Sequence, residues 1–251
     1  MGLFSFGKKN EEKNEIDYNN LPAHIGIIMD GNRRWAKRRG VSRNIGHQAG
    51  AQAFRRIVRD CEEIGIRYLT VYAFSTENWS RPKDEVDALC ALFHEFVAQT
   101  RNEIGGEHTK INFLGDIGAF PKDLADEFLE VQNREVEEVR LVVNIAVNYG
   151  GRGEIVMAVN QMLQQVKNGS RRMDAVATEE ELRQLLYTQD MPDPDLIIRG
   201  GGEMRLSNFL IWQAAYAEFW FSDVLWPDFT KQHLLEAVRS YQSRDRRYGG
   251  I

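Results

Sequence analysis

Cysteine is nearly absent from the 251-residue chain, which contains only Cys61 and Cys90. Their spacing matches neither a zinc site nor a redox pair, and two cysteines cannot build the disulfide framework of a small secreted protein. We therefore expect two reduced thiols and a cytoplasmic location. Long apolar runs are also missing, because none approaches the ~20 residues that a membrane-spanning helix needs. The first residues lack the basic flank of a signal peptide, so we expect none.

Acidic residues are absent from one long stretch of an otherwise acidic chain. The formal net charge is −5, yet residues 31–59 contain nine Lys or Arg and no Asp or Glu. A local field of this sign favours an anionic ligand. Asp30 stands directly before the stretch. A lone carboxylate beside cations favours a divalent metal that bridges it to phosphate.

Alternating strand and helix patterns predict a single α/β domain with a mostly parallel central sheet flanked by helices. Strands buried on both faces read as continuous apolar runs, and we predict them at residues 24–29, 67–74, 111–114, 140–148 and 195–198. Helices are predicted at residues 48–64, 84–103, 122–134, 153–168, 178–187 and 231–244. Residues 1–20 are polar and predict a disordered tail, which leaves residues 21–251 as the domain.

The carboxyl ends of these strands carry the most unusual residues of the chain. Ligands of such sheets bind beyond the carboxyl ends of the strands. That rule places Asp30, residues 74–79, residues 148–152 and Arg199 along one edge. We therefore predict a single binding site at this edge.

The cationic stretch divides into residues that face solvent and residues that can face a ligand. A tight turn alone explains Gly31-Asn32. The cations at 37–39 suit a solvated helix face, whereas Arg33, Arg34 and Arg43 can turn toward a site. His47 is a lone histidine, usually structural, but it suits a further cationic donor near phosphate.

Residues 72–82 leave a buried strand and become polar at once. Capping explains Ser75 and Thr76, but it explains Asn78, Trp79 and Arg81 less well. An exposed indole between an amide and a guanidinium is unfavourable unless something covers it. A loop that closes over a partly apolar, partly anionic substrate would cover it.

Three glycines, residues 200–202, follow the last predicted strand. Glycines let the backbone approach an anion closely, and Arg199, Arg205 and Ser207 add a bidentate-capable clamp and a hydroxyl. The loop matches neither a Walker A motif nor a dinucleotide fingerprint, so it favours a second phosphate pocket. Glu218, within an aromatic run, either points to solvent or, if it reaches the edge of Asp30, is a metal ligand.

Taken together, these motifs resemble the cis-prenyltransferase family of the undecaprenyl diphosphate synthase type. The matching segments follow the family order from residue 24 to the C-terminus. They are residues 29–36, 46–47, 72–82, 148–152, 195–199, 202–209, 216–219, 225–229 and 246–250.

The resemblance implies a homodimer, an apolar tunnel and Mg²⁺ as the metal. It implies successive condensation of isopentenyl diphosphate onto farnesyl diphosphate with new cis double bonds. The implied product is undecaprenyl diphosphate, the carrier lipid for cell-wall polysaccharide synthesis. Its insolubility in water implies a peripheral membrane contact for release, and no nucleic-acid partner is implied. Side chains from residues 84–103 and 140–148 are expected to set the product length.

The resemblance also assigns roles to single residues. Asp30 binds Mg²⁺ and assists departure of the allylic diphosphate. Asn78 holds the position assigned to proton transfer; because an amide is a poor base, we expect it to orient the transfer while a diphosphate oxygen takes the proton. The allylic diphosphate is bound by Gly31, Asn32, Arg33 and Arg34, with help from Arg43, His47 and Arg81.

Further roles follow from the same resemblance. Contacts with substrate are implied for Trp35, Ser75, Thr76, Glu77 and Trp79. Isopentenyl diphosphate is held by Arg199, Arg205, Leu206 and Ser207. Glu218 is the second metal ligand, reached from the partner subunit, and Arg247-Tyr248-Gly249 completes the isopentenyl site across the dimer.

Two departures from the family pattern carry expectations of their own. Arg33 stands where the common pattern has glycine, which either strains the backbone or adds charge. Gly200-Gly201 stand where the family has Thr-Ser, so two hydroxyls are lost and a more flexible loop is expected.

Two other classes of protein stay open. A non-catalytic partner subunit would have lost the chemistry, and the presence of Asp30, Asn78, Arg199, Arg205 and Glu218 argues against it. A nucleic-acid-binding protein would interleave stacking aromatics with its cations. Residues 31–59 contain only Trp35 and Phe54 as aromatics.

Overall fold

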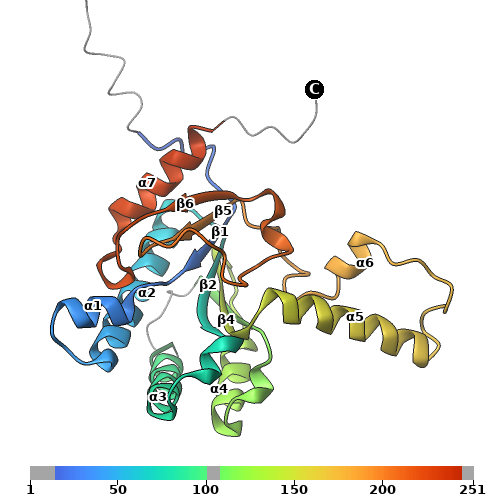
Figure 1. The fold of residues 1–251 in the computed structure, drawn as a ribbon. Coiled ribbons are helices and arrows are strands. Elements are labelled where there is room, and N and C mark those ends of the chain that lie inside the picture. The colour runs from blue at the N-terminus through green and yellow to red at the C-terminus, as the bar shows by residue number, and fades with distance from the viewer. Residues whose placement is uncertain (1–14, 101–107, 245–251) are drawn as a thin grey trace, which may run out of the picture.

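A six-stranded parallel sheet forms the centre of the protein in a computed structural model that describes residues 15–100 and 108–244 (Figure 1). The strands lie in the order β3-β4-β2-β1-β5-β6, and every neighbouring pair is parallel. The prediction of a mostly parallel α/β domain is confirmed. The strand bounds are β1 His24–Ile28, β2 Tyr68–Ser75, β3 Thr109–Leu114, β4 Leu141–Tyr149, β5 Leu196–Arg199 and β6 Glu218–Phe221.

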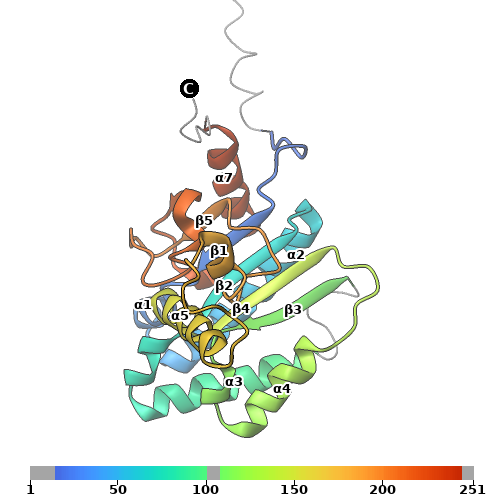
Figure 2. The ribbon, with the colours of Figure 1, turned by 90° about the vertical axis from the view of Figure 1, so that its right-hand side faces the viewer.

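Helices cover the two faces of the sheet unequally. The larger apolar core joins the strands to α2, α3, α4 and α7, and a smaller core on the other face contains Tyr149, Phe209 and Leu210. Figure 2 shows α3 and α4 beside one another beneath the sheet. The helix bounds are α1 Asn32–Arg38, α2 Arg43–Ile64, α3 Lys83–Thr100, α4 Lys122–Gln132, α5 Gly151–Lys167, α6 Glu179–Arg183 and α7 Lys231–Gln242.

A row of polar side chains, buried except for the half-buried Asn112, crosses four strands within the sheet. His24 on β1 hydrogen-bonds through Nε2 to Oγ1 of Thr70 on β2 at 2.7 Å. Asn144 on β4 donates to the same hydroxyl at 3.2 Å, and Asn112 on β3 donates to Asn144 at 3.1 Å. Thr70 pairs in register with Asn144, and Asn144 with Asn112. Each polar group in the row therefore finds its partner across a strand boundary.

Four elements, α1, α2, α6 and β6, differ from the sequence-based expectations. The helix expected from residue 48 begins at Arg43, and α1 forms a separate short helix before it. Residues 178–187 were expected to be helical, but α6 ends at Arg183. One reason is that the Tyr187 N–H donates to the carboxylate of Glu154 rather than to a helical carbonyl. Strand β6 was not predicted, because four residues of an aromatic run show no usable periodicity.

The described part of the predicted tail lies against the last helix. The side-chain amide of Gln242 on α7 donates to the carbonyls of Asp17 and Asn20 at 2.7 and 2.9 Å. Residues 1–14 lie outside the described residues, as do Arg247-Tyr248-Gly249 and residues 101–107 of the helix expected at 84–103. Within residues 15–100 and 108–244, no helix combines the length and apolarity that crossing a bilayer requires.

Candidate active site

The carboxyl ends of β1, β2 and β5 bring the chemically distinctive residues together. Asp30 follows β1, Ser75 ends β2 and Arg199 ends β5. These strands are neighbours and parallel, so their carboxyl ends share one edge of the sheet. The structure places Asp30, Ser75 and Arg199 at the edge where the sequence analysis expected them.

Asp30 is held by an arginine on each of its two oxygens. Arg34 on α1 donates from Nη2 to Oδ1 at 2.9 Å, and Arg199 donates from Nη2 to Oδ2 at 2.9 Å. Arg199 is buried and also donates to the Ser207 hydroxyl at 2.7 Å and to the Arg205 carbonyl. The carboxylate thus joins the α1 side of the site to the β5 side through charge-assisted hydrogen bonds.

The glycines after β5 make close contacts that leave no room for a Cβ in this structure. Gly201 has a φ of +79°, which favours glycine. A Cβ at Gly201 would stand 2.5 Å from Nη2 of Arg34. Nη1 of the same arginine donates a hydrogen bond to the Gly201 carbonyl. A Cβ on Gly200 would stand 2.4 Å from the Val224 carbonyl oxygen. The N–H of Gly201 and that of Gly202 each donate to the segment after β6 at 2.8 Å. These contacts give a physical reason for glycine where the family pattern has Thr-Ser.

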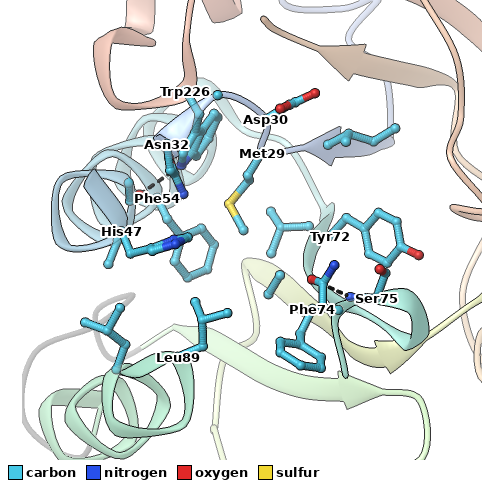
Figure 3. Close-up of a pocket in the computed structure, with 18 of the residues that line it drawn as sticks. Met29, Asp30, Asn32, His47, Phe54, Tyr72, Phe74, Ser75, Leu89 and Trp226 are labelled. Atoms are coloured by element: carbon cyan, nitrogen blue, oxygen red, sulfur yellow. Dashed lines mark hydrogen bonds between the residues drawn. The ribbon is translucent and has the colours of Figure 1, made fainter. Parts of the chain in front are cut away.

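A cavity of about 530 Å³ opens beside Asp30. Its mouth is polar, whereas its deeper wall is apolar and comes from α2, α3 and the sheet (Figure 3). Met29 points into it between Phe54 and Tyr72. The predicted site residues that line it are Asp30, Gly31, Asn32, Arg33, Arg34, His47, Ser75, Asn78, Arg81, Arg199 and Ser207. The apolar wall is consistent with the expected tunnel, and phosphate binding by the cations at its mouth stays a prediction.

The segment after β2 is anchored by its own polar contacts. Ser75 and Asn78 form a capping box, in which the Ser75 N–H donates to Oδ1 of Asn78 at 3.2 Å. The indole N–H of Trp79 donates to Asn148 at 2.8 Å, and the ring packs against Phe74 and Phe120. Trp79 nevertheless stays 37% exposed, so the contact of its indole with a covering substrate stays a prediction.

Other predicted contact residues point elsewhere. The Trp35 indole donates to Asp228 at 2.8 Å and its ring lies under Arg39. Arg205 pairs with Glu203, and Leu206 packs against the smaller core. The cavity wall also omits Arg43, Thr76 and Glu77. These residues surround the site without lining its cavity.

Burial works against the positive charge that the sequence analysis expected of His47. It is buried, and burial lowers the pKa of its imidazole, while the nearby Glu85 carboxylate opposes this only in part. A histidine whose pKa is lowered in this way is neutral at neutral pH. His47 therefore contributes a neutral imidazole to the cavity.

Glu85 is the principal residue that sequence reasoning missed. Arg33, Arg43, His47 and Arg81 all converge on its carboxylate. The signal was present in the i,i+4 spacing of Arg81 and Glu85. Gly50 was also passed over, and Gly46 was named only as part of a matching segment. A Cβ on either would stand within 2.5 Å of an Asn32 atom, so both let α1 pack on α2.

Asp30 is the carboxylate that the described cavity lining offers to a metal ion. Among the described residues, no three His, Cys, Asp or Glu side chains converge as ligands. Glu218 lies at the amino end of β6, the opposite edge from Asp30, and pairs with Arg244. Mg²⁺ commonly takes one or two carboxylates and completes its shell with water and substrate phosphate. A single Asp30 beside a phosphate-binding mouth fits that donor set.

Comparisons with known proteins agree with this geometry. A family described as "Putative undecaprenyl diphosphate synthase" matches residues 28–249. An isoprenyl transferase of Clostridium tetani is 47% identical over 243 residues, which are 97% of this chain and 95% of that protein. The ditrans,polycis-undecaprenyl-diphosphate synthase ((2E,6E)-farnesyl-diphosphate specific) of Pasteurella multocida is 46% identical over 236 residues, 94% of this chain and 98% of that protein. The crystal structure of lavandulyl diphosphate synthase from Lavandula x intermedia in complex with dimethylallyl diphosphate superposes with a TM-score of 0.86 at 35% identity, covering 92% of this chain and 99% of that one.

Proposed function

The chain belongs to the undecaprenyl diphosphate synthase family, and we propose that it is an Mg²⁺-dependent enzyme that adds isopentenyl diphosphate units to farnesyl diphosphate in cis. It is an isoprenyl transferase, and its proposed product is undecaprenyl diphosphate for cell-wall polysaccharide synthesis. One observation carries the proposal. The cavity of about 530 Å³ joins an arginine-clamped carboxylate at its mouth to an apolar wall built from α2 and α3. A substrate with a charged head and a hydrocarbon tail fits both ends of this cavity.

The site divides into two diphosphate pockets that meet at Asp30. Arg33, Arg34 and Arg81 lie on the allylic side, and Arg199 and Ser207 lie on the isopentenyl side. As the allylic C1–O bond breaks, the diphosphate leaves with the electron pair and these cations stabilise its charge. When bound at Asp30, Mg²⁺ supplies further charge neutralisation for that leaving group.

Bond formation is governed by orientation. C4 of isopentenyl diphosphate bonds to allylic C1, and a proton is lost from C2. Holding both substrates in line supplies much of the rate enhancement. Phe54, Leu89 and Phe93 line the apolar wall and exclude water from the allylic cation. Asn78 orients the proton transfer, and an oxygen of a diphosphate receives the proton.

A homodimer is part of the proposal. Val156, Val159 and Leu163 form an exposed apolar face on α5, which extends away from the sheet (Figure 1). Their i, i+3, i+7 spacing puts them on one side of the helix, and a contiguous exposed apolar face suits a protein interface. A second copy of this chain is the proposed occupant, and it is proposed to bring its own Glu218 to Asp30.

Mixed dimers test the shared metal site. Asp30→Asn and Glu218→Gln variants should each be inactive alone. After mixing and subunit exchange, half the dimers contain one of each subunit, and one of their two sites is native, so about a quarter of wild-type activity should return. If Glu218 serves its own subunit, the mixture stays inactive.

The proposed location is cytoplasmic, with peripheral membrane contact for release of the insoluble product. The corner between α1 and α2 exposes Lys37 and Arg38 beside Val41 and Ile45, which are 37% and 45% exposed. Cations next to apolar side chains suit an anionic lipid surface. Sedimentation with anionic vesicles should pull down the protein, and Lys37→Gln with Arg38→Gln should weaken binding about fivefold per charge. Equal binding to neutral vesicles would contradict this contact.

The enzymatic proposal is tested by incubation with farnesyl diphosphate, labelled isopentenyl diphosphate and Mg²⁺, with and without a chelator. Chelator-sensitive formation of a long polyprenyl diphosphate is the expected result, and sizing gives the chain length. A folded dimer that transfers no label would overturn the proposal and favour a non-catalytic partner subunit. Strong, salt-sensitive binding of DNA or RNA would favour the nucleic-acid alternative.

A further inference from the structure

Glu85 is a buried carboxylate in the first turn of α3. Its side chain is 2% exposed, whereas the neighbouring Asp84 faces solvent. A buried charge is unfavourable unless other charges and hydrogen bonds compensate it. Glu85 therefore depends on the cations around it.

Those cations come from three different parts of the chain. Nη1 of Arg81, before α3, donates to Oε1 at 2.9 Å, and Nη1 of Arg43 on α2 donates to Oε2 at 3.4 Å. Nε of Arg33 on α1 lies 3.8 Å from Oε1, and Nε2 of His47 lies 3.7 Å from it. One carboxylate thus connects α1, α2 and the start of α3.

The cluster keeps an excess of positive charge. Three arginines against one glutamate leave a net charge of +2, since His47 is neutral. The side chains of Arg33, Arg43 and Arg81 are 50%, 55% and 28% exposed. Each guanidinium has five N–H donors. Most of these donors therefore remain available to an anion when the arginines are paired with Glu85.

We propose that Glu85 is a positioning residue that gathers Arg33, Arg43 and Arg81 into a preorganised receptor for the allylic diphosphate. The inference rests on the proposed function, which places that diphosphate at these arginines. Without Glu85, three like charges would repel one another, and long side chains would have to be ordered when the anion binds. Arg33, present where the family pattern has glycine, belongs to this receptor through the same carboxylate.

Simple electrostatics and preorganisation predict opposite results. Removing a negative charge next to an anion site should strengthen anion binding by Coulomb attraction alone. If Glu85 positions the arginines, its removal should weaken binding. The sign of the change therefore separates a positioning role from a purely electrostatic one.

The experiment measures inorganic pyrophosphate binding to the full chain by calorimetry in chelator, with steady-state kinetics alongside. Glu85→Gln should weaken pyrophosphate binding about tenfold and raise KM for farnesyl diphosphate by a similar factor. KM for isopentenyl diphosphate should stay within about twofold. Asp84→Asn is the matched control, because Asp84 is exposed and adjacent to Glu85, so the variant removes the same charge without touching the arginines. The affinity of this variant for pyrophosphate should not fall.

A folded Glu85→Gln protein that binds pyrophosphate as tightly as wild type, or more tightly, overturns the proposal. If that variant does not fold, Glu85→Asp takes its place, because it keeps the charge and withdraws the carboxylate by one methylene. Weaker binding by Glu85→Asp supports the positioning role, and unchanged binding overturns it. Failure of the proposed function has a separate signature, in which wild type binds pyrophosphate but transfers no label.

Discussion

Arg199 donates a hydrogen bond of 2.9 Å to Asp30, although the two residues are 169 positions apart in the chain. The contact ties the end of β5 to the end of β1. Arg34 occupies the other oxygen of the same carboxylate. The two proposed diphosphate pockets therefore share Asp30.

Arg199→Lys should lower turnover about 100-fold with little loss of secondary structure. A lysine ammonium cannot donate hydrogen bonds to Asp30, Ser207 and the Arg205 carbonyl with the planar geometry of the Arg199 guanidinium. Losing one preorganised donor at a developing charge costs about 10²–10³ in rate. Turnover of labelled isopentenyl diphosphate is the measurement. A variant within about twofold of wild type would show that Arg199 is dispensable.

Gly201→Ala should reduce activity by displacing Arg34. A Cβ at this position meets the Arg34 guanidinium at 2.5 Å in addition to the strain of a φ of +79°. Gly169→Ala is a matched control, because Gly169 has a φ of +80° with nothing within 4 Å of the new Cβ. Both variants should lose about 1 kcal/mol of stability from strain, measured by urea unfolding. Only Gly201→Ala should lose isoprenyl transfer activity. Equal activities of the Gly201→Ala and Gly169→Ala variants would show that the position of the Arg34 guanidinium does not matter for activity.

Asn78→Asp should fold normally and turn over about 100-fold more slowly. The new carboxylate can still accept the Ser75 N–H, so the capping box is preserved. It cannot donate a hydrogen bond while ionised, and it adds negative charge beside the diphosphates. Initial rates and thermal unfolding separate the two effects. Full turnover would remove any strict requirement for the amide.

Val159→Asp should convert the dimer to a monomer and abolish most activity. It places a charge in the centre of the apolar face of α5, where Val159 is 44% exposed. Leu129→Asp on α4 is the control, since Leu129 is 43% exposed on a different helix. Sedimentation velocity gives the oligomeric state. A dimer that survives Val159→Asp would move the proposed interface elsewhere.

Acidification should destabilise the protein through His24. Burial lowers the pKa of His24 from 6.5 to about 4, opposed by a backbone hydrogen bond to Pro192 and by the Asp195 charge. The unfolded chain therefore binds the proton more readily than the folded protein, and stability present above pH 6.5 is lost as pH falls toward 4. The full effect is about 3 kcal/mol.

The measurement for His24 is urea unfolding at about pH 7 and about pH 4.5, a comparison that reports the linkage directly. His24→Gln should be less stable at neutral pH, because the pairing with Thr70 is altered. Its stability should nevertheless fall less between the two pH values. The same fall in both proteins would assign the pH dependence to other groups.

Sequence reasoning located the site because its signals were local. Asp30 follows an apolar strand, and the rule for parallel sheets then places it beside Arg199. The short α1 and the four-residue β6 were not recognised, because neither is long enough to show a period. Glu218 could be named from the family resemblance, but its position at the far edge depends on a strand that the pattern did not reveal.

Glu85 shows why part of a site stays hidden in a sequence. In the chain it reads as an ordinary acid in the first turn of a helix, next to Lys83 and Asp84. Its role comes from Arg33 and Arg43, which approach from two other helices. Likewise, the neutral state of His47 follows from burial among residues that are distant in the chain. Both properties depend on tertiary contacts and produce no periodic pattern in the sequence.

The polar row from His24 through Thr70 and Asn144 to Asn112 helps to fix the register of the strands in the sheet. Sliding one strand by a residue would turn its polar side chain to the other face and leave its partners buried and unpaired. Apolar strands alone tolerate such slippage, since one branched side chain packs much like another. Slipped registers of β1, β2, β4 and β3 are thereby penalised together, which favours the arrangement that brings Asp30 and Ser75 to one edge.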